Sequence, residues 1–204
     1  MIDPITLNAR KPRDDASGRA MLARMNEHHK ALHKWALEHV SLDRAERILD
    51  IGCGGGENLH NLSAMLPHAR LWGLDHSEAS IRRCREVNLE AVEAGRLRLQ
   101  QGSVEALPYE KNSFDLVTAF ETVYYWPDIE RSFRRVLDTL DDRGAFLICN
   151  EDSRREGNEA VAEALDMQFY TAEELGALLH RAGFRTVHTY SHEHSSWVCA
   201  VGRK

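Results

Sequence analysis

Short apolar runs alternate with amphipathic stretches along most of this chain. The apolar runs predict strands over residues 47–51, 70–74, 96–101, 114–119 and 144–150. Between them, apolar positions recur every three or four residues and predict helices over residues 58–65, 78–94 and 128–140. Strands that alternate with helices are typical of a parallel sheet joined by crossover helices.

The pattern changes in the last quarter of the chain. Thr171 and Glu174 form a capping-box sequence that opens a helix ending at Ala182, and Gly183 stops it. Strands are then predicted over residues 184–190 and 196–202, with a connection too short for a crossover helix, so they should pair antiparallel. The predicted fold class is therefore α/β: a Rossmann-like seven-stranded sheet with five parallel strands, a C-terminal antiparallel hairpin and helices on both faces.

The first 40 residues follow a different pattern. Residues 1–16 contain Pro4, Pro12 and mixed charges without periodicity, which predicts an arm that is loose or is ordered by a ligand. From Ser17 to Val40, apolar and histidine positions share one helical stripe. We expect an N-terminal arm and capping helix over residues 1–40 and a ligand-binding body over residues 41–204, which together form one globular domain.

Composition narrows the possible partners. The 204 residues are 43% apolar, enough for a full core, and the net charge of −6 argues against a general nucleic-acid binder. The N-terminus lacks the pattern of a signal peptide, and no stretch approaches about 18 apolar residues. We expect a cytoplasmic protein that binds neither nucleic acid nor membrane. The four cysteines are too scattered for a disulfide framework or a zinc site.

Four glycines between Gly52 and Gly56 follow the first predicted strand and precede a helix. Such a loop lets the backbone approach a nucleotide closely. The dinucleotide-binding fingerprint needs a third glycine where Glu57 stands, and a phosphate-binding loop needs a lysine after the glycines, which is missing. Both phosphate-binding interpretations are therefore weakened, although an oxidoreductase on the same sheet stays an alternative.

Asp50, Gly52, Gly54 and Gly56 form an Asp-x-Gly-x-Gly-x-Gly pattern that resembles the loop of class I S-adenosylmethionine-dependent methyltransferases, in particular their small-molecule, type 11-like domains. Asp75 ends the second strand about 20 residues later, where a carboxylate accepts ribose hydroxyls. The resemblance continues to about residue 150.

One departure from the family lies after Gly102. The family places there a carboxylate that binds the adenine amino group, whereas this chain has Ser103. We expect the Ser103 hydroxyl and the Val104 backbone to make that contact. Glu105 matches an acidic position of the family, but a solvated loop carboxylate explains it equally well.

The resemblance implies S-adenosylmethionine as cofactor and S-adenosylhomocysteine as product. The predicted cofactor-binding residues are Asp50, Gly52, Cys53, Gly54, Gly56, Asn58, Asp75, His76, Ser77, Gly102, Ser103, Val104, Glu105 and Phe120.

Methyl transfer from a sulfonium is a direct displacement, so the enzyme mainly aligns the acceptor and excludes water. The sequence Phe120-Glu121-Thr122-Val123 stands where an Asn-Pro-Pro-Tyr sequence would indicate a nucleobase or amide acceptor, so a small molecule is favoured. The predicted catalytic residues are Glu121, Tyr124 and His29. The predicted acceptor-binding residues are Met25, His29, Glu121, Tyr124, Tyr125 and Trp126.

Each of these side chains also has a structural interpretation, because Glu121 can cap a turn, and the aromatic residues and His29 can pack in the core. His192 and His194 lack an acid at clear ligand spacing beyond Glu193, so we expect no metal. The alternative functions are a methyltransferase for a protein or RNA group and a non-catalytic cofactor-binding protein. The acceptor, the choice among O, N and C attack, and the choice between monomer and homodimer stay open.

Overall fold

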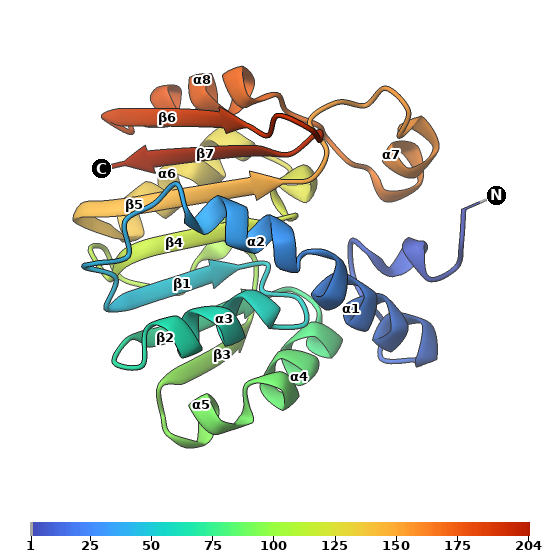
Figure 1. Ribbon diagram of the computed structural model, residues 1–204, viewed down its shortest axis with the longest axis horizontal. Coiled ribbons are helices and arrows are strands. Elements are labelled where there is room, and N and C mark those ends of the chain that lie inside the picture. Colours follow the sequence, from blue (N-terminus) through green and yellow to red (C-terminus); the bar gives the residue numbers. More distant parts are fainter. Residues whose placement is uncertain (1) are drawn as a thin grey trace.

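The computed structural model describes residues 2–204 and contains one seven-stranded sheet (Figure 1). Its strands are β1 (Arg47–Ile51), β2 (Arg70–Asp75), β3 (Leu97–Gln101), β4 (Phe114–Phe120), β5 (Leu140–Asn150), β6 (Thr186–Ser191) and β7 (Val198–Arg203). They lie in the order β3-β2-β1-β4-β5-β7-β6. The first five are parallel, and β7 is antiparallel to both β5 and β6. The predicted fold class is confirmed.

Helices cover both faces of this sheet. They are α1 (Ala16–His28), α2 (Lys30–Leu37), α3 (Glu57–Met65), α4 (Glu78–Val87), α5 (Leu89–Glu93), α6 (Ile129–Thr139), α7 (Glu159–Leu165) and α8 (Ala172–Ala182). One buried apolar cluster packs the helices α2, α3, α4 and α5 against one face of the sheet. Another packs α6 and α8 against the opposite face. Burying apolar area on both faces is the main force that holds such a sheet together.

Two predicted helices are each divided. The stretch 17–40 forms α1 and α2, which meet at His29 (φ −88°, ψ 3°), and the stretch 78–94 forms α4 and α5, which meet at Asn88. The Asn88 amide donates hydrogen bonds to the carbonyl oxygens of Gly56 at 3.0 Å and Cys84 at 2.9 Å. The second break therefore lies against the glycine loop. The sequence pattern also missed α7 and the early start of β5 at Leu140.

The N-terminal arm packs against the body of the protein, whereas its composition predicts an arm that is loose or is ordered by a ligand. Asn8 is buried, the Ser77 hydroxyl donates a hydrogen bond to the carbonyl of Pro12 at 2.6 Å, and Arg10 forms an ion pair with Asp166 at 2.9 Å. These partners come from distant parts of the chain and leave no local sequence signal. The arm and α1 lie beyond the carboxyl ends of the parallel strands, which is where open α/β sheets bind ligands (Figure 1).

Across residues 2–204, we find no helix with both the length and the apolar character needed to cross a bilayer. The division of the chain at residue 40 stays a prediction.

Candidate cofactor and acceptor site

The glycine loop between β1 and α3 adopts a conformation that favours glycine. Gly52, Gly54 and Gly56 have φ values of 76°, 50° and 85°, in the left-handed region. A Cβ atom at Gly56 would also lie 2.6 Å from the sulfur of Cys84. The N–H groups of Gly52 and Cys53 both donate to the Leu74 carbonyl, at 2.7 and 3.1 Å. The loop is thereby held against the end of β2.

Asp75, at the end of β2, organises the same region. Its Oδ2 accepts a hydrogen bond from the Gly54 N–H at 2.9 Å, and its Oδ1 accepts one from the Ser77 N–H at 2.8 Å. Burial raises the pKa of this carboxyl group. Because a carboxylate has about four lone-pair sites, Asp75 keeps capacity to accept ligand hydroxyls.

A cavity of about 430 Å³ opens beside Asp75 and the glycine loop. Seven predicted cofactor-binding residues line it: Gly52, Asp75, His76, Gly102, Ser103, Val104 and Glu105. Sequence reasoning missed Arg10, Lys11 and Thr122, which also line it. The sequence could have indicated Thr122, because it lies just after β4, at the sheet edge where ligands bind. Nothing in the sequence around Arg10 and Lys11 indicates that they line the cavity. A carboxylate, a hydroxyl and a loop without side chains suit a nucleoside, so the residues present fit the implied cofactor.

The other predicted cofactor-binding residues do not line this cavity, and their contact with the cofactor stays a prediction. Asp50 is 2% exposed and accepts a hydrogen bond from the Thr118 hydroxyl at 2.6 Å, and burial raises its pKa to about 6. Asn58 donates to the same hydroxyl at 3.3 Å. Cys53 is buried, Ser77 caps α4, and Phe120 packs on His33 with ring centroids 4.5 Å apart. Gly54 and Gly56 shape the loop.

A second cavity, of about 350 Å³, lies between α1, α7 and the residues that follow β4 and β5. Four predicted acceptor-binding residues line it: Met25, His29, Glu121 and Tyr125. Tyr125 lines the first cavity as well, so the two cavities adjoin at this residue. The remaining wall consists of apolar side chains of α1 and α7, Thr6 and Ala9 of the arm, Met167, and the polar residues Arg24, His28 and Glu151.

Glu121 follows β4 with φ of 55°, a left-handed conformation that is uncommon for a residue with a side chain. Its backbone N–H donates to the Cys149 carbonyl at 3.0 Å. Its carboxylate Oε1 accepts a hydrogen bond from the Glu151 N–H and lies 3.3 Å from the Tyr124 hydroxyl. Its side chain is 13% exposed, and burial raises its pKa to about 8.

Tyr124 is buried and does not line the second cavity, so its predicted contact with the acceptor stays a prediction. Its hydroxyl oxygen accepts a hydrogen bond from the Asp152 N–H at 2.9 Å. Trp126 does not line the second cavity either; its ring packs on Phe133 and Phe146, and the residue lines the first cavity.

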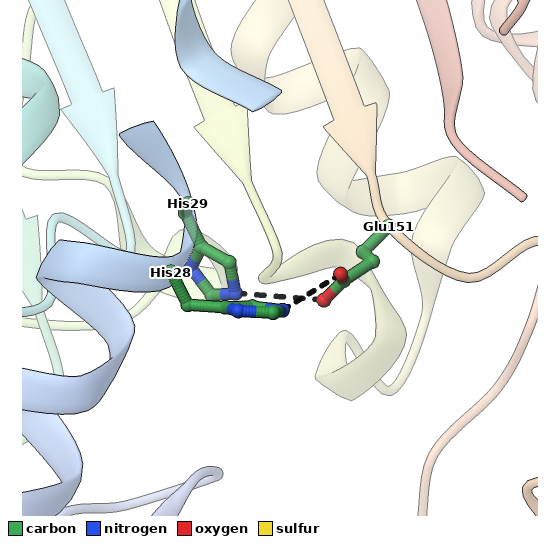
Figure 2. Close-up of side chains that lie close together, drawn as sticks. All are labelled: His28, His29 and Glu151. Atoms are coloured by element: carbon green, nitrogen blue, oxygen red, sulfur yellow. Dashed lines mark hydrogen bonds and ion pairs between the residues drawn. The ribbon is translucent and has the colours of Figure 1, made fainter. Parts of the chain in front are cut away.

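His29 directly follows α1 and faces the carboxyl groups of Glu121 and Glu151; Figure 2 shows it beside His28 and Glu151. Its Nε2 lies 4.0 Å from Oε2 of Glu121 and 3.8 Å from Oε2 of Glu151. Burial lowers the pKa of His29 to about 4, with a smaller contribution from His28. His28 Nε2 lies 2.8 Å from Oε1 of Glu151. The structure therefore brings the three predicted catalytic side chains together, and it adds His28 and Glu151, which sequence reasoning missed. The sequence could have indicated Glu151, because it directly follows a predicted parallel strand, where open α/β sheets bind ligands.

Residues 42–184 match the family model described as a methyltransferase domain. The chain is 28% identical to trans-aconitate 2-methyltransferase of Variovorax paradoxus over 140 residues, which are 69% of this chain and 52% of that protein. It is also 28% identical to malonyl-[acyl-carrier protein] O-methyltransferase of Geobacter sulfurreducens, over 72% of this chain and 58% of that protein. The chain thus spans about half the length of these curated relatives.

Solved structures share the fold. The protein bound to the Trm112 methyltransferase activator in a Haloferax volcanii complex has a TM-score of 0.81 at 19% identity, with 100% of this chain and 98% of that chain covered. Phosphoethanolamine N-methyltransferase 2 of Haemonchus contortus, in complex with S-adenosylmethionine, has a TM-score of 0.79 at 12% identity, with 100% and 60% covered. The match over residues 42–184 shows that the chain belongs to the class I S-adenosylmethionine-dependent methyltransferase family, and the shared fold and the glycine loop beside Asp75 agree with it.

Proposed function

We propose that this protein transfers a methyl group from S-adenosylmethionine to a small-molecule acceptor bound in the second cavity. The observation that carries the proposal is the position of Tyr125, which lines both cavities. A donor in the first cavity and an acceptor in the second would meet at this residue, as a direct displacement requires.

The chain's own residues then have distinct tasks. Asp75, Ser103 and the glycine loop hold the cofactor, which supplies the methyl group when bound. Glu121 and His29 face the acceptor and hold it against the cofactor cavity, with Met25 on the apolar wall. Tyr124 is a positioning residue, because its hydroxyl lies between Glu121 Oε1 and the backbone of Asp152. The arm residues Arg10 and Lys11 help to exclude water from the first cavity.

A small acceptor is supported by the size of the second cavity, about 350 Å³, and by the Variovorax relative, which is named for the metabolite trans-aconitate. A macromolecular acceptor is the second candidate, since the Haloferax neighbour, which is covered over 98% of its length, is bound to a methyltransferase activator protein. A cytoplasmic location and a monomeric or homodimeric state stay predictions.

Two measurements test the proposal. Calorimetry of the folded protein with S-adenosylhomocysteine should show binding, and the absence of heat would contradict it; a shift of the melting temperature by NAD instead would favour the oxidoreductase alternative. Incubation with methyl-labelled cofactor and a metabolite extract should then place the label in small molecules. Label in protein or RNA would support the second candidate, and binding without any labelled product would indicate a non-catalytic cofactor-binding protein.

A further inference from the structure

We propose that His28, His29 and Glu151, with Glu121 beside them, bind one divalent transition-metal ion of the zinc class at the wall of the second cavity. Sequence reasoning predicts no metal for this chain, so the proposal rests on what the folded chain brings together. It does not depend on the proposed function, because it concerns metal binding alone.

The first argument is the spacing of the candidate ligand atoms. One atom each from His28, His29 and Glu151 lie within 4.8 Å of one another. The separations to the Glu151 oxygens are 2.8 Å for His28 and 3.8 Å for His29. Ligand atoms that are each about 2.1 Å from a shared ion lie roughly 3 to 3.5 Å apart, so small side-chain rotations suffice to place one ion among the three.

The second argument is how the backbone directs these side chains. Successive residues of a continuous helix point about 100° apart, which would separate two neighbouring histidines. Here His28 ends α1, and His29 is the linking residue before α2. Figure 2 shows both rings extending toward Glu151. Glu121 and Glu151 reach the same place because β4 and β5 are neighbours in register, with Phe120 opposite Cys149.

The third argument is charge. Glu121 Oε1 accepts the Glu151 N–H, while its Oε2 faces His29 at 4.0 Å. Arg24 also lines this cavity, but its guanidinium pairs with Asp3 at 3.1 Å and bonds the Thr6 hydroxyl at 2.9 Å. Two carboxylates therefore face the cavity with two imidazoles beside them. An incoming divalent ion would therefore meet carboxyl oxygens and imidazole nitrogens at a place where the Arg24 guanidinium is already paired elsewhere.

The donor set indicates the class of metal. Imidazole nitrogen with carboxylate oxygen suits zinc, iron, nickel and copper, whereas magnesium and calcium prefer oxygen ligands alone. Two histidines and one glutamate also form the ligand set of zinc sites that keep a position open for water or substrate. His28 is 62% exposed and Glu151 is 30% exposed, so an ion can enter from solvent.

The test uses the full chain without an affinity tag, stripped by chelator and titrated with Co²⁺. We expect visible absorption bands that saturate at one ion per chain and disappear when Zn²⁺ is added. His28→Ala and Glu151→Gln should each weaken Co²⁺ binding at least tenfold. His28 is exposed, so its variant should fold, which circular dichroism checks. The control is His192→Ala/His194→Ala, which removes two histidines near Trp197, away from this cavity, and should leave binding unchanged.

The proposal is overturned if the cobalt absorption bands do not saturate at one ion per chain. It is also overturned if neither His28→Ala nor Glu151→Gln weakens the affinity for Co²⁺. Loss of binding in the His192/His194 variant instead would place the ion at the exposed hairpin and would also overturn it. Binding of S-adenosylhomocysteine to the stripped protein is measured in parallel. If S-adenosylhomocysteine still binds while cobalt does not, the metal proposal has failed and the proposed function has not.

Discussion

The Asp75 carboxylate joins β2 to the glycine loop, because its Oδ2 accepts a hydrogen bond from the Gly54 N–H at 2.9 Å. The same side chain lines the first cavity. One residue therefore both shapes the loop and faces the proposed cofactor, which makes it the most informative position for a binding test.

Replacing Asp75 with Ala should weaken S-adenosylhomocysteine binding by roughly ten- to a hundredfold, about 1.4 to 2.8 kcal/mol. Glu105→Ala is the matched control, because it removes an exposed carboxylate from the same cavity and should change affinity by less than about threefold. Calorimetry measures both. Equal losses in the two variants would show the ribose assignment of Asp75 to be mistaken.

The left-handed turn at Gly56 should tolerate no side chain. Gly56→Ala places a Cβ 2.6 Å from Cys84 Sγ and forces alanine to φ of 85°. We expect the free energy of unfolding to fall by about 2 to 4 kcal/mol. Gly95→Ala is the control, since φ there is 69° and nothing lies within 4 Å, so only the backbone cost of about 1 to 2 kcal/mol applies. Urea denaturation measures both, and similar losses would contradict the packing argument.

Removal of the Tyr124 hydroxyl should destabilise the protein, because Tyr124→Phe leaves the partly buried Asp152 N–H without the oxygen that accepts its hydrogen bond at 2.9 Å. The expected loss is about 1 to 3 kcal/mol. Tyr109→Phe is the control. Within the described residues, the buried Tyr109 hydroxyl has no hydrogen-bond partner, so its removal should be neutral or stabilising. Thermal and chemical denaturation compare the two, and a harmless Tyr124→Phe would refute the positioning role.

Asp50 should make stability depend on pH. Burial raises its folded-state pKa from 3.8 to about 6, so the protonated form is favoured in the folded protein. The favourable contribution of protonated Asp50 to the free energy of unfolding is complete below about pH 4 and is lost as the pH rises through 6. Asp50→Asn keeps an acceptor for Thr118 but cannot ionise. Relative to the natural protein, this variant should therefore gain about 2 to 3 kcal/mol between pH 4 and pH 8.

Urea denaturation at several pH values measures this difference. Asp138→Asn is the control, because that carboxylate is 60% exposed and should leave the pH dependence nearly unchanged. A constant difference between the Asp50 variant and the natural protein across this range would contradict the role assigned to burial.

Much of the architecture was readable because it is encoded locally. The seven strands lie within a few residues of their predicted positions, since each apolar run reports its own burial in the sheet. The breaks that separate α1 from α2 at His29 and α4 from α5 at Asn88 could not be predicted from the sequence, because the helical periodicity of apolar positions continues through both. Asn88 shows one physical basis, since its amide bonds the Gly56 carbonyl, which is 32 positions away in sequence.

The sequence by itself determined the sheet, the glycine register and Asp75, and hence the family and its cofactor, because these depend on spacing within short segments. Only the tertiary structure decided that Asp50 lies buried behind the loop and that His28 and His29 meet Glu121 and Glu151. That second group joins α1 to the ends of β4 and β5, about 90 to 120 positions apart. Its geometry depends on how α1 packs across the sheet edge, and no local pattern reports such packing.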